Sequence, residues 1–152
     1  VIFMRVGYPI KIIFKKECFV TLYFDDVDEL LVRNKNIICY NSEKELIDSE
    51  KSIYELDDSL VVYDFTKINY ENPVDYKEVL DKWNLLNTIA KMYNMYFEGN
   101  QKNKTYTYKY LFSCVFSIDE LPKYYKLPKK CLLDINKVFK KTERYMSKLV
   151  KQ

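Results

Sequence analysis

The sequence predicts an α+β fold, with a small, mainly antiparallel sheet from the N-terminal half packed against helices of the C-terminal half. Runs of β-branched and aromatic residues dominate the first 65 residues. From about residue 72, apolar residues recur at three- and four-residue steps, which is typical of helices. The 152 residues contain no internal repeat and no linker, so we expect a single domain over residues 1–152.

The first predicted elements form a hairpin. "IKIIF" (10–14) and "FVTLYF" (19–24) are rich in strand-forming residues, and the charged "KKE" joins them. The next segment, "DDVDELLVRNK", places acidic residues where a helix begins. We expect Asp25 or Asp26 to cap a short helix there, because the helix dipole favours acids in the first turn.

Two more strands and a helix complete the N-terminal half. "NIICY" (36–40) predicts a third strand. Ser42 followed three residues later by Glu45 is a capping box, so a helix is expected over residues 43–50. "SLVVYDF" (59–65) predicts a fourth strand. Its nearly continuous apolar run indicates burial on both faces and a central position in the sheet.

A long helix is the clearest element of the C-terminal half. Asn72 is its expected N-cap, Pro73 its first residue and Gly99 its stop. One apolar stripe follows the helical period, so this helix should pack across the sheet. Its members are Tyr76, Val79, Leu80, Trp83, Leu86, Ala90, Tyr93 and Phe97.

The remaining segments are less regular. Residues 105–116 fit either a strand or a helix, and the spacing favours a helix. Residues 118–128 read as a connection punctuated by proline. A last helix is expected from about 128 to 148. Its predicted buried stripe is Leu132, Ile135, Phe139, Thr142, Met146 and Leu149.

The composition excludes most enzyme classes. Without histidine the chain has no Ser-His-Asp or Cys-His catalysis and no imidazole metal site. Two glycines are too few for a phosphate-binding or dinucleotide-binding loop. We therefore predict no catalytic residue, no metal site and no cofactor. Catalysis by a carboxylate such as Asp64 with a lysine is the weaker alternative, because Asp64 fits a cap at the end of its strand.

The sequence predicts a cytoplasmic protein without membrane contact. No window of about 18 apolar residues exists. The apolar N-terminal segment contains Arg5, Lys11, Lys15 and Lys16, so it does not read as a signal peptide. The four cysteines lie outside C-x-x-C spacing and are expected to be reduced, with two disulfides in an exported protein as the alternative.

Charge is divided along the chain. Residues 1–75 carry 9 Lys/Arg and 15 Asp/Glu, whereas residues 76–152 carry 16 and 7. Acidic residues gather in two segments, the first read as a capped helix start on a solvated face and the second as a polar turn. A divalent-cation site in the first segment is the weaker alternative, because spaced oxygen ligands and a turn glycine are absent there. If the sheet brings both segments to one edge, they would form a surface for a basic partner. Tyr124 and Tyr125 are the tyrosines most expected to be exposed for an interface. The predicted partner-binding residues are therefore Asp25, Asp26, Asp28, Glu29, Asp57, Asp58, Tyr124 and Tyr125.

The basic C-terminal helix supports an alternative function. Its cations could follow a phosphate backbone, although they are also what a solvated helix face requires. Lysine also outnumbers arginine there, and arginine is the better bidentate reader of phosphate. The residues of this nucleic-acid-binding alternative are Lys137, Lys140, Lys141, Arg144 and Lys148.

Several segments together resemble the small immunity proteins of bacterial contact-dependent inhibition and polymorphic toxin systems. They are "DDVDEL", "IICYNSEKELI", "VVYDF", "KWNLLNTIAKMY" and "YKYLF". The resemblance implies a protein without catalysis that binds and neutralises a cognate toxin domain, often a nuclease. Because contacts differ between pairs in this family, the matched residues Tyr63, Asp64, Phe65, Trp83 and Asn84 are expected to hold the fold. The basic second half departs from an all-acidic nucleic-acid mimic.

Overall fold

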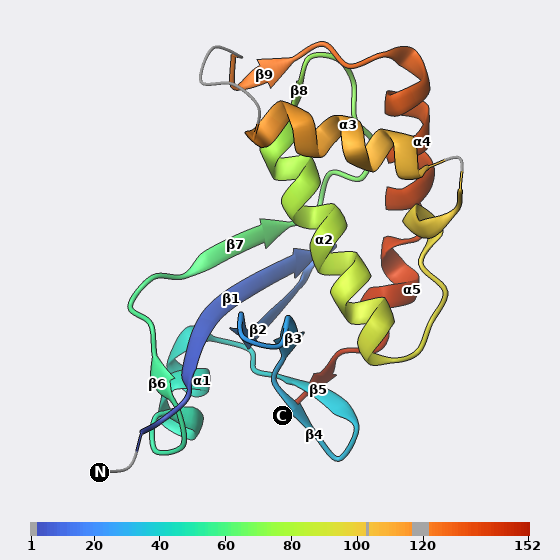
Figure 1. The fold of residues 1–152 in the computed structure, drawn as a ribbon. Coiled ribbons are helices and arrows are strands. Elements are labelled where there is room, and N and C mark those ends of the chain that lie inside the picture. Colours follow the sequence, from blue (N-terminus) through green and yellow to red (C-terminus); the bar gives the residue numbers. More distant parts are fainter. Residues whose placement is uncertain (1–2, 103, 117–121) are drawn as a thin grey trace. The chain divides into compact units, whose positions relative to one another are not determined.

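A computed structural model describes residues 3–102, 104–116 and 122–152 (Figure 1). They form two compact units. Unit 1 comprises the described residues up to Thr66 together with Met146–Gln152, and unit 2 comprises Lys67–Tyr145. The predicted α+β class with small, mostly antiparallel sheets is confirmed. A single domain, and the packing of the long helix across the sheet, stay predictions.

The predicted hairpin forms the centre of unit 1. β1 (Val6–Phe14) pairs antiparallel with β2 (Glu17–Phe24), from Tyr8 opposite Tyr23 to Phe14 opposite Glu17. Side chains of β1 alternate between buried and more exposed positions along most of the strand, as a strand with one core face requires.

The helix predicted after the hairpin is wrong. Residues 25–28 instead form a turn into β3 (Glu29–Leu30), which pairs antiparallel with β2. Asp28 has a φ of 52°, the left-handed conformation that aspartate tolerates in turns. Leu30 lies opposite Tyr23 and is 1% exposed. Burial of this leucine in the sheet therefore overrides the local capping signal.

The third strand and the first helix are confirmed. β4 (Val32–Arg33) pairs antiparallel with β5 (Asn36–Cys39). α1 (Glu43–Glu50) starts with the predicted capping box, because the Ser42 hydroxyl oxygen accepts the Glu45 N–H at 3.2 Å. Leu46 of α1 joins the buried cluster of this unit, whose other members are Val20, Leu22, Phe24, Leu31, Ile38 and Tyr40.

Two parallel strands lie beside β1. β6 (Glu55–Leu56) pairs with the start of β1, and β7 (Val61–Asp64) pairs with its second half. The prediction that the fourth strand is central and buried on both faces is wrong, since Val61 is 47% and Val62 is 51% exposed. Phe65, directly after the strand and 1% exposed, supplies the buried apolar side chain instead.

The last strand of the chain also belongs to unit 1. β10 (Val150–Lys151) pairs parallel with β5. In Figure 1 this red strand and the cyan β5 lie side by side.

The long helix of unit 2 begins later than predicted. α2 (Tyr76–Met92) has Asp75 as its N-cap, whose carboxylate accepts the Glu78 N–H at 3.1 Å. Asn72, the predicted cap, instead uses its side chain to bond both the N–H and the C=O of Leu127, at 2.8 and 2.9 Å. The Asn72–Pro73 peptide bond is cis.

The predicted end of this helix is also wrong. The helix ends at Met92, and Asn94 then adopts a left-handed φ of 57°. Gly99 lies in the short helix η1 (Glu98–Asn100), against the ring of Trp83. The predicted apolar stripe is largely buried, with Tyr76 and Tyr93 partly exposed. Its buried members are Val79, Leu80, Trp83, Leu86, Ala90 and Phe97.

The choice of helix for residues 105–116 is confirmed by α3 (Thr105–Phe116). Within the predicted connection, β9 (Tyr124–Tyr125) pairs antiparallel with β8 (Val74–Asp75), while residues 117–121 lie outside the described residues.

The last predicted helix is interrupted. α4 (Lys129–Phe139) and α5 (Thr142–Met146) replace it, and the Thr142 hydroxyl donates to the Phe139 carbonyl at 2.6 Å. Such a bond to the preceding turn competes with helix continuation. Most of the predicted stripe is nevertheless buried, with Leu132 partly exposed. None of the described helices is long and apolar enough to cross a membrane.

Candidate partner-binding surface

The first acidic segment is a solvent-exposed turn. Asp25, Asp26 and Asp28 between β2 and β3, and Glu29 at the start of β3, are all exposed. The Arg5 guanidinium donates to both oxygens of Asp26, at 2.8 and 3.2 Å, and this bond lowers the pKa of the Asp26 carboxyl. Asp28 accepts the Tyr23 hydroxyl at 2.7 Å.

The second acidic segment follows β6. One oxygen of Asp57 accepts the backbone N–H of Ser59 at 3.1 Å and also its hydroxyl. These bonds fix a turn and lower the pKa of Asp57. Asp58 is exposed. Asp57 therefore shapes its loop, while Asp58 leaves its charge in solvent.

The sheet brings these two segments to one end of unit 1. Arg5 holds Asp26 of the first segment with its side chain, and its carbonyl accepts at 2.9 Å the N–H of Glu55, two residues before Asp57. β2 and β6 lie on either side of β1, and neighbouring strands in a sheet are about 4.8 Å apart, so these two strands are about 10 Å apart. The Debye length is about 30 Å at 0.01 M salt and about 10 Å at 0.1 M, so the potentials of the two segments overlap at low salt and are screened as salt increases. Arg5 offsets one of the carboxylates.

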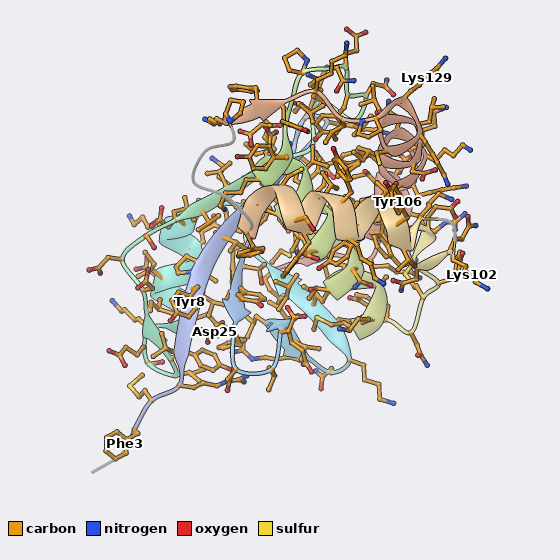
Figure 2. The ribbon with its side chains drawn as sticks, turned by 45° about the horizontal axis from the view of Figure 1, so that its top comes forward. Phe3, Tyr8, Asp25, Lys102, Tyr106 and Lys129 are labelled. Carbon is orange, nitrogen blue, oxygen red and sulfur yellow. The ribbon has the colours of Figure 1, made fainter. Side chains whose placement is uncertain are left out.

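A groove lies beside this acidic end. Its volume is about 620 Å³, and it opens between the N-terminal residues, α1 and the segment around β6. Apolar and acidic side chains share its wall with a single lysine, Lys51. Phe3 is 89% exposed and extends away from the strands in Figure 2. The lining residues are Phe3, Met4, Glu43, Ile47, Lys51, Tyr54, Glu55, Leu56, Asp57 and Asp58.

The groove combines negative charge with large apolar side chains. This composition fits a basic protein segment that also presents an apolar side chain, since polar rims and apolar centres are typical of protein interfaces. Among the residues described, no cluster of three or more potential metal ligands is found.

One buried ion pair supports α1 at this end. The Glu50 carboxylate is 1% exposed, accepts Arg33 through both oxygens, one at 2.8 Å, and accepts the Tyr40 hydroxyl at 2.6 Å. Burial raises the pKa of Glu50, but the hydrogen bonds from Arg33 and Tyr40 outweigh it, and the net shift is downward. This network was not predicted from the sequence, because its members are 10 and 17 residues apart.

The predicted tyrosines belong to unit 2. Tyr124 is 55% exposed on β9. Tyr125 is partly buried and its side chain bonds Tyr110, which raises the pKa of Tyr110 to about 12. The acidic members of the predicted set therefore belong to unit 1 and the tyrosines to unit 2, and Tyr124 is the exposed member of the pair.

The cations of the nucleic-acid alternative are divided between the units. Lys137, Lys140, Lys141 and Arg144 belong to unit 2, whereas Lys148 belongs to unit 1. All except Lys141 are exposed. Their use as one phosphate-binding row stays a prediction.

Asp64 has a structural role at the end of β7. One of its oxygens accepts the Thr66 backbone N–H at 2.9 Å and the Thr66 hydroxyl at 2.6 Å. It fixes the turn after the strand, as predicted, although no helix starts there. The four cysteines are free, as expected, and all except Cys18 are buried.

Comparison with known proteins finds a similar fold in one solved structure and no matching family. No protein-family model matches the chain, and no curated protein matches it. A solved structure, "The crystal structure of SatS c-terminal domain in complex with bromine", is similar with a TM-score of 0.59 and 18% sequence identity. The match covers 96% of this chain and 94% of that chain. At this identity the similarity establishes a shared fold alone.

Proposed function

We propose that the protein binds and neutralises a cognate bacterial toxin domain by stoichiometric contact, without catalysis of its own. The observation that carries the proposal is the gathering of two acidic segments at one end of a sheet, beside a groove with apolar walls. The resemblance of the sequence to immunity proteins supplies the class of partner. A basic toxin face is the complement that this surface requires.

Replacement of three carboxylates can test partner binding without disturbing the fold. Asp25, Glu29 and Asp58 are exposed and make no hydrogen bond or ion pair within the part of the chain that the structure describes. Asp26 and Asp57, in contrast, hold Arg5 and Ser59. The first three can therefore be neutralised with little effect on the fold.

The test uses the toxin domain encoded next to this protein. The wild type should form a 1:1 complex with it and abolish its activity. The variant Asp25→Asn, Glu29→Gln, Asp58→Asn should need a higher concentration for the same inhibition, because complementary charges speed association.

A matched control variant removes the same number of negative charges from other positions. The residues Glu17, Asp48 and Glu71 are also exposed and lie outside the groove and both acidic segments. Their replacement by Gln, Asn and Gln should leave inhibition unchanged. A complex that fails to form with the wild type would exclude toxin neutralisation, and equal inhibition by both variants would exclude the acidic surface.

A further inference from the structure

The outer face of α3 carries the largest apolar side chains of that helix. Tyr106, Phe112 and Phe116 are 56%, 46% and 67% exposed. The face that packs into unit 2 instead carries smaller residues, namely Thr107, Leu111 and Cys114. An amphipathic helix usually directs its bulkiest apolar residues to the core. The exposed phenylalanines are therefore not explained by the folding of this unit.

These rings form a continuous row along the helix. The Phe112 and Phe116 ring centroids are 4.5 Å apart, and those of Tyr108 and Phe112 are 6.4 Å apart. Tyr106 lies 6.3 Å from Tyr110 in a second row. Figure 2 shows Tyr106 on the helix that faces the viewer.

Two lysines lie beside these aromatic rings. α3 contains no Asp or Glu, and Lys109 on the same helix is exposed. The Lys130 ammonium lies 5.8 Å from the centre of the Tyr106 ring. Tyr125 of β9 bonds Tyr110 of α3, and because successive side chains of a strand point to opposite faces, the exposed Tyr124 points away from α3.

The neighbouring Lys123 adds less charge to this side. Its ammonium lies 5.5 Å from the Tyr124 ring, but also 3.8 Å from an Asp75 oxygen, which partly neutralises it. We define the α3 surface as Tyr106, Lys109, Phe112, Phe116 and Lys130.

We propose that the α3 surface docks onto an anionic lipid bilayer. Exposed phenylalanines can enter the boundary between headgroups and acyl chains, tyrosines suit the interface, and lysines contact the anionic headgroups. Single-stranded nucleic acid fits less well, because bases stack on open ring faces and the Phe112 and Phe116 rings already pack on each other. This peripheral contact differs from the sequence prediction of no membrane partner, which addressed spanning segments and a signal peptide.

Vesicle sedimentation tests the proposal with the full chain. The probes are vesicles of phosphatidylcholine alone and of phosphatidylcholine with about 30% phosphatidylserine. The wild type should bind only the anionic vesicles, and more weakly as salt increases. Phe112→Ser with Phe116→Ser should lower the partition coefficient at least tenfold, and Lys109→Gln should lower it about fivefold.

A control variant removes one exposed aromatic ring elsewhere in the same unit. Tyr96 is 56% exposed in the same unit and outside the α3 surface, so Tyr96→Ser should bind vesicles like the wild type. Unchanged fluorescence of Trp83 and an unchanged melting temperature would show that the double variant is folded.

Three results would overturn the proposal. One is no sedimentation of the wild type with anionic vesicles at about 50 mM salt. Another is equal binding by the wild type and the double serine variant. The last is a different ligand for the surface. A complex with oligo-deoxythymidine that is tighter than vesicle binding and is abolished by the double variant would assign the surface to nucleic acid. A dimer seen by analytical ultracentrifugation and abolished by the double variant would assign it to self-association.

Discussion

Replacing Gly99 by alanine should destabilise unit 2 by steric overlap. An added Cβ would lie 2.4 Å from Cε2 of Phe97 and 2.7 and 2.8 Å from Cζ2 and Cε2 of Trp83. Carbon atoms in contact are about 3.5–4.0 Å apart, so a ring must move. Both rings are 2% exposed and meet edge to face with centroids 5.9 Å apart, which leaves neither a free direction. The backbone is no obstacle, since Gly99 has no positive φ.

The expected magnitude follows from this overlap. Inserting a methyl group into a packed core costs about 1–3 kcal/mol. For a protein of about this size each kcal/mol lowers the melting temperature by roughly 2–4 °C, so the Gly99→Ala variant should melt roughly 2–12 °C lower.

Trp83 is the single tryptophan, so its fluorescence reports unfolding of this unit in thermal and urea titrations. Gly7→Ala, in unit 1, is the control and is followed by far-ultraviolet circular dichroism, because Trp83 reports unit 2. There the nearest atom is the flexible end of Leu22 at 3.1 Å, and the loss should be smaller. A Gly99→Ala midpoint within about 1 °C of the wild type would refute the overlap.

Three other changes test the hydrogen bonds described above. Because the pKa of Glu50 is lowered by folding, its pairing with Arg33 stabilises the protein above the unfolded pKa and is lost as pH falls through the folded value. In urea titrations at pH 7 the wild type should therefore have a higher free energy of unfolding than Glu50→Gln. This difference should shrink as the pH falls below about 4, and a difference that does not change with pH would contradict the pairing. Asp64→Ala should lower the free energy of unfolding by about 0.5–2 kcal/mol through loss of the bonds to Thr66, with unaltered toxin binding; lost binding at full stability would make it a contact residue. Ser42→Ala should cost about 1 kcal/mol in the same titration, and no loss would mean that the cap contributes nothing.

Local signals in the sequence predicted the elements that local interactions determine. The capping box of Ser42 and the hairpin around Lys15 need only neighbouring residues, and both were predicted. Asn72 and Pro73 carried a similar helix signal, but a contact with Leu127, 55 residues away, gives Asn72 another role. Asp75 then caps the helix instead. Signals of equal strength can therefore differ in outcome once distant contacts compete.

The candidate surface was predictable in charge but not in geometry. Composition indicates which carboxylates gather in two loops. Their common position depends on the pairing of β1 with both β2 and β6, which are far apart in the sequence. Pairing of this kind follows from sheet register, which the hydrophobic pattern of short strands specifies only partly. The exposure of Phe112 and Phe116 was not predicted for a related reason. Apolar residues lie on several faces of α3, so the sequence does not indicate which face of the helix packs into the core.

The association rate at two ionic strengths tests the central claim most directly. For the wild type and the toxin domain encoded beside it, the rate should fall at least tenfold between about 20 mM and 300 mM salt, because the acidic end of unit 1 attracts its partner. The Asp25→Asn, Glu29→Gln, Asp58→Asn variant should associate more slowly at low salt and show a shallower dependence. A wild-type rate that does not change with salt, or a variant with the same slope, would contradict the proposed acidic docking surface.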